Sequence, residues 1–377
     1  MRIGILTLPL FSNYGGILQA YALQTVLERL GHEVRVIDCD RKDFRFPSWK
    51  RPLVYVKRGI KKVLVDPSIE LNVEAKMRRE RPILWQYVTA FQKRYIKFYL
   101  VRTVADIKRE DFDAIVVGSD QIWRLMYIRN SWLRRCSQAF LGFTKGWDIK
   151  RYAYAASFGV DRWEYSKRDT AECAILAKDF DAISVREDSA VDLCRKYLDV
   201  EVVHLLDPTL LLRAEDYGQL IDAAPLSQDG GGELLSYILD NSQAKKELIE
   251  RISRERKMSV FTVNAKGEEE AATFDERIYP PVERWLKGFA DARMVVTDSF
   301  HGCIFSILFG KPFVVIGNVE RGLSRMRSLL RMFGLEDHLL FNVSEYESDR
   351  SYAQPSTVRE RINELRRQSM DFLSKIQ

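Results

Sequence analysis

A carboxylate, a hydroxyl and a histidine lie within four residues of one another late in the sequence. They are Asp298, Ser299 and His301, and Gly302 follows them. Histidine titrates near neutral pH, and a neighbouring carboxylate could orient it or act as a base, so this group could perform acid–base chemistry. A plainer interpretation is that Asp298 or Ser299 only caps a helix. The segment alone does not separate the two interpretations.

The flanking residues predict the elements that would hold this group. An apolar run at 294–296 predicts a strand, and the apolar residues from Cys303 to Phe309 predict a helix that ends at Gly310. A helix begins with unpaired N–H groups and a partial positive charge, which together suit an anion. A strand, a short polar turn and a helix form the arrangement that places side chains in the crevice of an α/β sheet.

The start of the chain predicts a βαβ unit, which is typical of a parallel sheet. We expect a strand at 2–8, a helix at 17–30 and a second strand at 34–38. Leucine and alanine residues recur at helical spacing in the middle segment, and Gly31 ends it.

Paired glycines precede that first helix, in a loop that also contains Asn13. Gly15 and Gly16 would let a ligand approach the backbone, and Gln19 on the first helical turn could reach the same crevice. The spacing is not that of a dinucleotide-binding fingerprint. A simple tight turn is the commoner explanation of such a pair.

Polar side chains also follow other predicted strands. Asp120 and Gln121 come after a buried strand at 114–117, and Arg186 comes after another at 182–185. The carboxyl ends of parallel strands meet at one edge of a sheet, which is where ligands bind in open α/β folds. Two domains facing each other would therefore share one cleft lined by these side chains.

We therefore predict an α/β protein with two Rossmann-like domains whose parallel sheets face a shared cleft. The first domain is expected at 1–205 with an insertion at 41–108, and the second, which carries the His301 turn, at 206–350. A final helix at 355–377 could pack back on the first domain.

Composition bounds the class of protein. The chain has 377 residues, of which 46% are hydrophobic and 30% charged, so a packed globular protein is expected. No stretch approaches the roughly 18 apolar residues that a membrane span needs. We find neither a nucleophile elbow nor a P-loop.

The five cysteines are scattered without a CxxC pair. This spacing argues against a disulfide framework and a thiolate zinc site, and it suits a reducing cytosol. No cluster of histidine and carboxylate residues has metal-ligand spacing, so we predict no metal and no cofactor.

Basic residues are concentrated in the insertion, and the net charge is +6 with a pI near 8.9. Lysines and arginines crowd segments 41–62 and 76–97, and aromatic residues are interleaved in the second segment. Such a surface could lie on anionic lipid or on nucleic acid. The alternative is a solvated helical insertion with buried aromatic rings.

Several motifs occur in the order found in one known family. The chain closely resembles polysaccharide pyruvyl transferases over residues 1 to about 335, through NYGGILQAYALQ (13–24), VGSDQIW (117–123), ASFG (156–159), SVREDS (184–189), LDPTLLL (206–212) and TDSFHGCIFSILFGKPF (297–313). The resemblance implies a two-domain fold like that of GT-B glycosyltransferases. It also implies transfer of pyruvate from phosphoenolpyruvate onto a sugar as a ketal, with release of phosphate.

The resemblance also implies roles for individual residues. His301 matches the family's donor-site histidine, and Arg186 matches its arginine in the first half. Ser299 stands where a second arginine is expected, and Arg325, Lys311 or Arg321 could replace that charge.

The remaining site predictions follow from the chemistry that such a donor needs. Arginine binds phosphate and carboxylate through its bidentate fork, so Arg186 and Arg325 are the predicted anion clamps. His301 is the predicted general acid or phosphate ligand, and Asp298 its orienting group or a base. Asn13, Gly15, Gly16, Ser299, Gly302 and Lys311 complete the predicted donor site, and Asp120, Gln121 and Gln19 are predicted to bind acceptor hydroxyls.

Precursors of capsule and exopolysaccharide are usually built on a lipid carrier. We therefore expect a cytoplasmic enzyme with a lipid-linked glycan acceptor, touching the anionic inner face of the membrane through the insertion, and no nucleic-acid partner. Two alternatives remain open. One is a GT-B glycosyltransferase that uses a nucleotide sugar, and the other is a non-enzymatic module that binds lipid or nucleic acid through the basic insertion.

Overall fold

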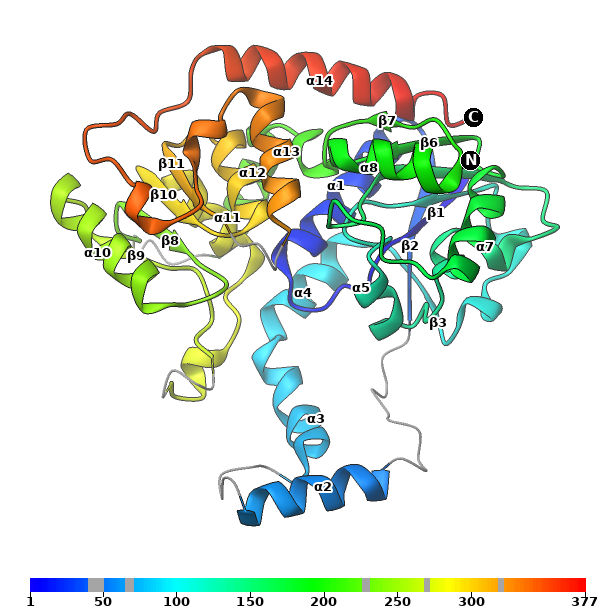
Figure 1. The fold of residues 1–377 in the computed structure, drawn as a ribbon, viewed down its shortest axis with the longest axis horizontal. Helices are drawn as coiled ribbons and strands as arrows, with labels where there is room; N and C mark the ends of the chain where they lie inside the picture. The colour runs from blue at the N-terminus through cyan, green and yellow to red at the C-terminus, as the bar shows by residue number, and fades with distance from the viewer. Residues whose placement is uncertain (40–50, 65–70, 226–230, 268–271, 318–321) are drawn as a thin grey trace.

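Two parallel β-sheets, one in each half of the chain, form the body of the molecule (Figure 1). The structure is a computed structural model that describes residues 1–39, 51–64, 71–225, 231–267, 272–317 and 322–377. Helices pack on both faces of each sheet, and the strands are buried apolar runs, as expected for sheets covered on both sides.

The N-terminal sheet has seven strands in the order β3-β2-β1-β4-β5-β6-β7, and all neighbours are parallel. Its strands are β1 (Arg2–Leu6), β2 (Glu33–Cys39), β3 (Phe98–Val101), β4 (Ala114–Val117), β5 (Lys150–Ala156), β6 (Ala182–Val185) and β7 (Val203–His204). The helices of this half outside the insertion are α1 (Tyr14–Arg29), α5 (Leu125–Asn130), α6 (Cys136–Ala139), α7 (Lys167–Ala177) and α8 (Asp188–Leu193).

The C-terminal sheet has five strands in the order β12-β11-β10-β8-β9, again all parallel. Its strands are β8 (Leu234–Tyr237), β9 (Val260–Phe261), β10 (Met294–Thr297), β11 (Phe313–Ile316) and β12 (Leu339–Leu340). The helices of this half are α9 (Ala214–Asp222), α10 (Gln243–Arg256), α11 (Val282–Asp291), α12 (Phe300–Leu308), α13 (Leu323–Phe333) and α14 (Thr357–Leu373).

These strand orders confirm the predicted fold class of two Rossmann-like domains with parallel sheets. In the first sheet the order reverses between β1 and β4, and in the second it reverses between β8 and β10. Such switch points open a crevice at the carboxyl ends of the strands, where ligands bind in folds of this kind.

Helix α1 begins earlier than the sequence suggested. Asn13 is its N-cap, with Oδ1 accepting a hydrogen bond from the Gly16 N–H at 3.2 Å, and Gly15 and Gly16 are helical. The predicted helix start at residue 17, with both glycines in the preceding loop, was wrong because the Asn13 cap extends the helix over both glycines.

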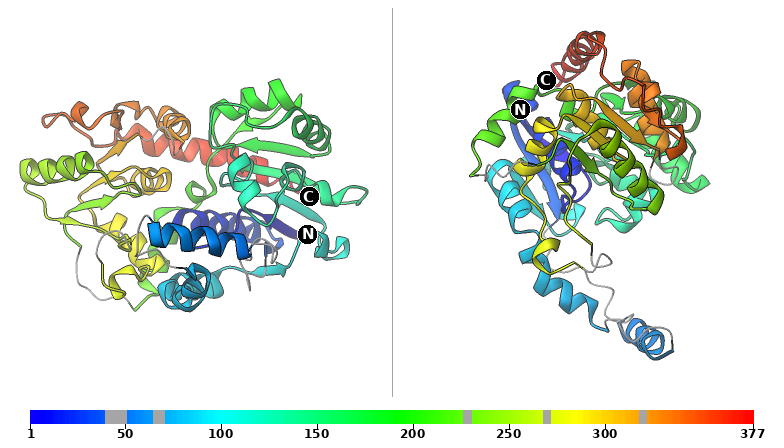
Figure 2. Two further views of the ribbon diagram at one scale, coloured as in Figure 1. Left: turned by 60° about the horizontal axis from the view of Figure 1, so that its bottom comes forward. Right: turned by 90° about the vertical axis from the view of Figure 1, so that its left-hand side faces the viewer.

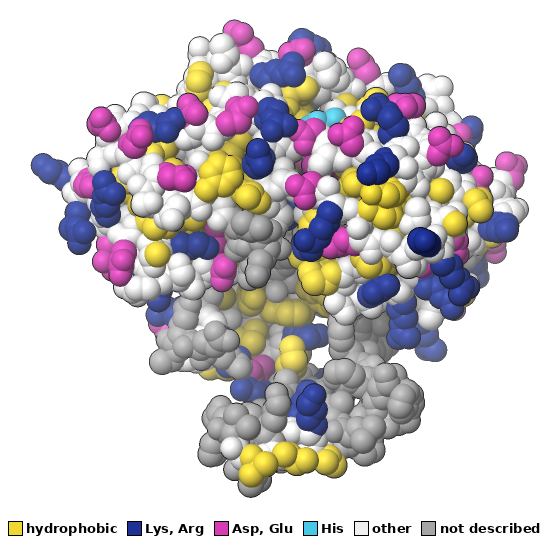
Figure 3. All heavy atoms as spheres, in the orientation of Figure 1, with side chains coloured by type: hydrophobic (Ala, Val, Ile, Leu, Met, Phe, Trp, Pro, Cys, Tyr) yellow, Lys and Arg dark blue, Asp and Glu magenta, His cyan; other side chains and the backbone are white. Residues whose placement is uncertain are grey.

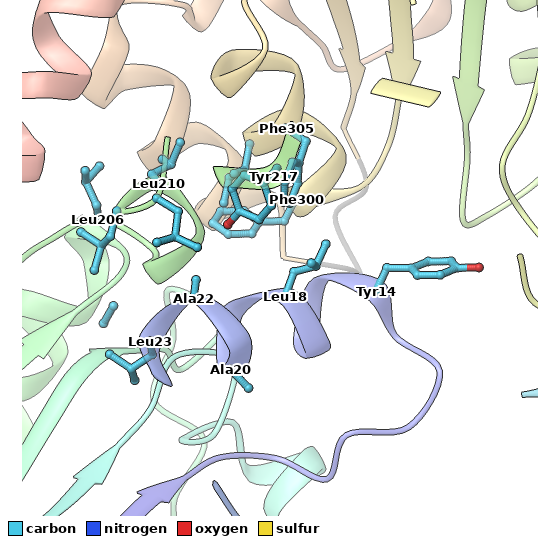
Figure 4. Close-up of a cluster of buried hydrophobic side chains, with 14 of the residues drawn as sticks. Tyr14, Leu18, Ala20, Ala22, Leu23, Leu206, Leu210, Tyr217, Phe300 and Phe305 are labelled. Atoms are coloured by element: carbon cyan, nitrogen blue, oxygen red, sulfur yellow. The ribbon is translucent and has the colours of Figure 1, made fainter. Parts of the chain in front are cut away.

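An apolar core joins the two halves (Figure 4). One face of α1, with Leu18 and Ala22, lies against Leu206, Leu210 and Tyr217 and against Phe300 and Phe305 of α12. Most of these side chains are fully buried. The two sheets therefore hold a fixed relation, and groups from both can build one site.

Helix α14 crosses from the C-terminal half to the N-terminal half, as its path along the top of Figure 1 shows. Arg366 donates to the carbonyl groups of Leu210 and Leu212, at 3.0 and 3.1 Å, and Ser369 Oγ accepts from the Leu206 N–H at 3.3 Å. These bonds fasten the chain segment that leads from β7 into the second domain.

The insertion forms an arm that projects from the body (Figure 2, right). It comprises α2 (Arg51–Leu64), α3 (Val73–Leu84) and α4 (Gln86–Tyr95), and the basic residues predicted between 41 and 50 lie outside the described residues. The insertion was predicted to extend to 108, but β3 lies within that range and pairs with β2 as the edge strand of the main sheet.

The aromatic residues near the base of the arm belong to the core. Phe91 is 2% exposed and packs against Tyr95 and Tyr21. Gln92 donates to the carbonyl groups of Leu10 and Phe11 and ties α4 to the loop after β1. The basic and aromatic surface predicted for segment 76–97 is thus partly an attachment to the body.

Candidate active site

Three strand ends of the N-terminal sheet meet in a buried ion pair. Arg186, which follows β6, donates from Nη1 to Asp207 Oδ2 at 2.6 Å, and Asp207 follows β7. Ser119, after β4, donates to the same oxygen at 3.1 Å. The side chains of Arg186 and Asp207 are 1% and 0% exposed. This arrangement fixes the guanidinium where the two halves of the chain meet, beside Phe300 of the C-terminal half.

Asp207 is held as an anion. Burial would raise the pKa of its carboxyl, but His301 and Arg186 outweigh burial and hold that pKa well below its ordinary value. Its other oxygen accepts from the N–H and hydroxyl of Thr209, at 3.0 and 2.7 Å. A carboxylate with this many donors stays ionised at neutral pH.

His301 reaches the ion pair from the second domain. Ser299 caps α12 by accepting a hydrogen bond from the Gly302 N–H, so His301 lies in the first turn, where helical N–H groups are unpaired. Its Nε2 stands 3.7 Å from Asp207 Oδ2, too far for a hydrogen bond but near enough for electrostatic attraction. The residue is 8% exposed.

Close backbone approaches bring these groups together. A Cβ atom on Gly15 would stand 2.0 Å from His301 Nδ1, so only glycine leaves room for the ring. A Cβ atom on Gly302 would stand 2.3 Å from Thr297 Oγ1, which packs the start of α12 against the end of β10. Of the three predicted glycines, Gly15 therefore adjoins the His301 ring, and a side chain, not a ligand, fills the space beside it.

Two arginines from different domains flank one aromatic ring. The guanidinium carbon of Arg186 lies 4.5 Å from the ring centre of Phe300, and that of Arg325, on the first turn of α13, lies 5.2 Å from it. Burial and Arg186 lower the pKa of Arg325 to about 10, while Glu187 and Asp120 act in the opposite direction. The Arg325 side chain is therefore still cationic at neutral pH.

Arg186 has donors to spare. Within the described residues, its buried Nε and Nη2 have no hydrogen-bond partner, and neither has His301 Nε2. A buried polar group normally finds a partner, so these atoms are available to an anion or a water molecule.

The three predicted acceptor residues differ in whether their side chains are engaged within the first domain. Asp120 has a left-handed backbone (φ 74°), and its carboxylate lies 3.7 Å from where a Cβ on Gly16 would stand, beside the start of α1. Gln121 is 8% exposed and accepts from Arg124 at 3.1 Å. Gln19 is fully buried and donates to Thr7 and to the Gly16 carbonyl, so it braces the loop and does not face the cleft.

Asp298 was predicted to orient His301, and the structure corrects this. Its carboxylate accepts from the N–H groups of Leu239 and Asp240, at 2.7 and 3.2 Å, and pairs with Lys245 Nζ at 2.7 Å. The carboxylate that faces His301 is Asp207, from the other domain. Sequence neighbours at a strand end point in different directions, so adjacency to His301 was a poor guide.

Lys311 was predicted to replace the missing arginine charge, but it follows the carboxyl end of α12. A helix of this length separates it from the first turn by about 13 Å, because each residue rises 1.5 Å. Ser299 is the N-cap of α12. Of the two proposed substitutes that lie within the described residues, Arg325 is the one close to Arg186 and Phe300. Arg321, the other proposed substitute, lies outside the described residues.

Ser119, Asp207 and Phe300 were not predicted as site residues. Asp207 was visible as a carboxylate after the last strand of the first sheet, in the conspicuous LDPT segment, and this signal could have found it. Glu187 was also missed. It accepts from the N–H groups of Phe158 and Gly159, at 2.8 and 3.1 Å, and shapes the turn after β5.

Among the described residues, no group of three or more histidine, cysteine or carboxylate side chains could hold a metal ion. In the same part of the chain, no helix is both long and apolar enough to cross a membrane.

Comparison with known proteins adds a family. The family model described as polysaccharide pyruvyl transferase matches residues 13–320. No match is found among curated proteins.

Similar solved structures share little sequence with the chain. They include a UDP-glucosyltransferase from Polygonum tinctorium (10% identity over 100% of this chain and 98% of that chain, TM-score 0.45) and MurG from Acinetobacter baumannii (11% identity, 100% and 94%, TM-score 0.44). Another is the E. coli heptosyltransferase WaaC with ADP (12% identity, 97% and 100%, TM-score 0.40).

Proposed function

The chain belongs to the polysaccharide pyruvyl transferase family, and we propose that it transfers pyruvate from phosphoenolpyruvate onto a sugar of a cell-surface polysaccharide precursor, such as one for capsule or exopolysaccharide. The product would be a ketal, and phosphate would be released. The observation that supports this proposal most directly is the pair of buried arginines, Arg186 and Arg325, on either side of Phe300 next to His301.

Phosphoenolpyruvate carries a phosphate and a carboxylate, and two guanidinium groups from different domains suit two anionic groups on one small molecule. Arg186 Nε and Nη2 have no hydrogen-bond partner among the described residues, so they are available to donate to one of these groups. The carboxylates of Asp207 and Glu187 are already hydrogen-bonded within the N-terminal half. Asp207 stabilises Arg186 through one nitrogen, Nη1, and leaves Nε and Nη2 of that guanidinium without a partner among the described residues.

In the proposed reaction His301 donates a proton to the methylene carbon of phosphoenolpyruvate, which becomes a methyl group and leaves a cationic centre at C2. One sugar hydroxyl attacks C2 and passes its proton to His301, which thereby regains the proton that it donated. A second hydroxyl then displaces phosphate from C2, and its proton leaves with the phosphate. The arginines stabilise the negative charge that develops on the leaving phosphate.

Asp207 supports His301 in this proposal. It is ionised, and it faces Nε2 from 3.7 Å. It can therefore hold the ring in one orientation by electrostatic attraction, while Gly15 leaves space for the ring on the Nδ1 side.

A thermal-shift comparison tests the donor. The purified protein would be melted with phosphoenolpyruvate and, in parallel, with a panel of uridine and guanosine diphosphate sugars. A ligand at 100 times its Kd stabilises the folded state by about 2.7 kcal/mol, which gives a measurable rise in Tm. Stabilisation by nucleotide sugars alone would replace the proposal with the alternative of a GT-B glycosyltransferase.

We further propose that the acceptor is linked to a membrane lipid and that the arm contacts the anionic inner face of that membrane. On α2, Val56, Ile60 and Leu64 recur every four residues and therefore share one face of the helix. They are 60%, 54% and 76% exposed. Figure 3 shows apolar side chains along the outer edge of α2, at the point farthest from the body.

The opposite face of α2 leans on the rest of the arm. Tyr55 donates to Asn72 at 3.4 Å, and Arg58 donates to the Leu71 carbonyl at 3.3 Å. The sequence of α2 contains five lysines and arginines and no acidic residue. An apolar outer face on a basic helix suits an interface of anionic lipid. Failure to cosediment with anionic liposomes at low salt would refute this contact.

A further inference from the structure

A groove opens beside the His301 turn, at the carboxyl ends of β8 and β9. Its volume is about 840 Å³, within the range of small-molecule sites. It is lined by residues 12–14, 236–241, 262 and 264–267, and by Tyr279. We name it the β8–β9 groove. It lies at the ends of β8 and β9, and β8 also borders β10 at the switch point of the C-terminal sheet.

One sequence neighbour and one close approach link this groove to the candidate active site. Tyr14, on its wall, is the residue before Gly15, which adjoins the His301 ring. Tyr237, also on the wall, lies 3.0 Å from where a Cβ on Gly302 would stand. A molecule in the groove would therefore lie near the turn that carries the histidine.

The lining of the groove differs in character from the arginine site. It offers amides, a carboxylate and aromatic edges, from Asn241, Asn264, Asp240, Tyr14 and Tyr279. Its one cationic side chain among the lining residues, Lys266, is paired with Glu276. Amides and carboxylates beside aromatic rings suit a neutral polyhydroxylated ligand, whereas an anion would favour the arginines.

Asp298 shapes the wall of this groove. From the end of β10 it accepts the backbone N–H groups of Leu239 and Asp240, which are themselves lining residues. Lys245 Nζ also donates to the Asp298 carboxylate and to the Asp240 carbonyl, at 2.7 and 2.8 Å, and so links the two residues. Asn264 donates to the Ile238 carbonyl at 2.7 Å and fixes the neighbouring strand end. The segment between Ile238 and Asp240 is therefore rigidly placed.

We propose that the β8–β9 groove binds the acceptor sugar, so that its hydroxyl groups face a donor held between Arg186 and Arg325. This assignment rests on the proposed function. It transfers the main acceptor contacts from Gln121 and Gln19, which are engaged inside the first domain, to the ends of β8 and β9. It also gives Asp298 a defined role, which is to fix the position of the groove wall at Leu239 and Asp240 relative to the His301 turn.

Saturation-transfer NMR tests the proposal with a panel of methyl glycosides of glucose, galactose, mannose and their N-acetylamino derivatives as probes. At least one glycoside should receive saturation from the wild-type protein, and Tyr279→Ala should abolish the signal. Asn241→Ala changes an exposed side chain, which protects against misfolding, and should reduce the signal several-fold. Asn130→Ala, at an exposed asparagine of α5, is the matched control and should leave the signal unchanged.

The same variants are melted with phosphoenolpyruvate, so that the two proposals fail separately. Tyr279→Ala and Asn241→Ala should keep the wild-type thermal shift with phosphoenolpyruvate, because the donor lies against the arginines. If no glycoside receives saturation, or if the signal survives in both groove variants, the acceptor assignment is overturned while the donor result stands. A missing shift with phosphoenolpyruvate in the wild type would instead refute the proposed function.

Discussion

Gly15 and His301 come from different domains, and no side chain separates them. A Cβ atom on Gly15 would stand 2.0 Å from His301 Nδ1 and 2.3 Å from Cγ, closer than any real contact allows. The first turn of α1 therefore forms one wall of the histidine's position, and Asp207 lies on the other side, 3.7 Å from Nε2. The ring is placed jointly by both halves of the chain.

The Gly15→Ala substitution should therefore displace His301. A shift of about 1 Å in a reacting group can cost on the order of 100-fold in rate, so phosphate release should fall by about that factor. Gly16 is the matched control, because a Cβ there would meet nothing nearer than 3.7 Å. Gly16→Ala should keep the activity and, as an alanine within a helix, raise stability by up to about 1 kcal/mol. Equal activity of the two variants would contradict this account.

The paired glycines show what the sequence could and could not reveal. The sequence predicted that they lie between a strand and a helix, and that polar residues gather at strand ends. It could not predict that His301 fills the space beside Gly15, because that residue lies almost three hundred positions later in the chain.

The choice of carboxylate failed for the same reason. Asp298 is three residues from His301 along the chain, but it is bound to Lys245 and to the end of β8. Asp207 is distant in sequence, and only the packing of β7 against β6 and of α12 against the first domain brings it to the ring. Periodicity predicts elements well, whereas contacts between domains depend on the tertiary fold.

His301→Ala should reduce turnover by about 10²- to 10⁴-fold, the usual contribution of a general acid. The fold should persist, because the ring packs beside Gly15 and Asp207 and is not part of the apolar core. Phosphate release from phosphoenolpyruvate with an acceptor glycan measures the effect. His32→Ala, at a half-buried residue near the N-terminus, is the control and should behave as wild type. Unchanged release in His301→Ala would remove the histidine from the mechanism.

Arg325→Ala should abolish the thermal shift with phosphoenolpyruvate, because it removes one of the two cations at Phe300. Arg327 lies on the same helix and is exposed, so Arg327→Ala controls for the general loss of positive charge on α13. Only the first variant should lose the shift. Arg325→Lys should restore part of it, because lysine keeps the charge but not the planar fork. Loss of the shift in both alanine variants would point to long-range charge instead of direct binding.

Asp207→Asn should destabilise the protein by about 3–5 kcal/mol at neutral pH, since it leaves the Arg186 charge buried without its partner. The folded protein lowers the pKa of Asp207, so the carboxylate stabilises the fold fully above the pKa of an unfolded aspartate, near 3.9. That contribution is lost as the pH falls further towards the folded-state value. Urea unfolding of both proteins should show a gap that is constant from pH 7 to about 5 and narrows below about pH 4. A gap independent of pH would mean that the lost bonds of Asp207, and not its charge, carry the stability.

Ile60→Asp should separate the apolar contribution to membrane contact from the basic one. Burying an isoleucine side chain stabilises by about 1.5–3 kcal/mol, so losing it should weaken binding to anionic liposomes by tenfold or more, at low and at high salt. Lys62→Ala should weaken liposome binding by about 1 kcal/mol, roughly fivefold, and only at low salt, because screening removes the electrostatic attraction.

Ile175 of α7 is 69% exposed against 54% for Ile60, but it lies on the body away from the arm, so Ile175→Asp is the matched control. Cosedimentation at two salt concentrations measures all three. If the Ile60→Asp and Ile175→Asp variants bind liposomes equally well, the outer face of α2 is not the membrane contact. A charged aspartate on a face buried in lipid would weaken the binding.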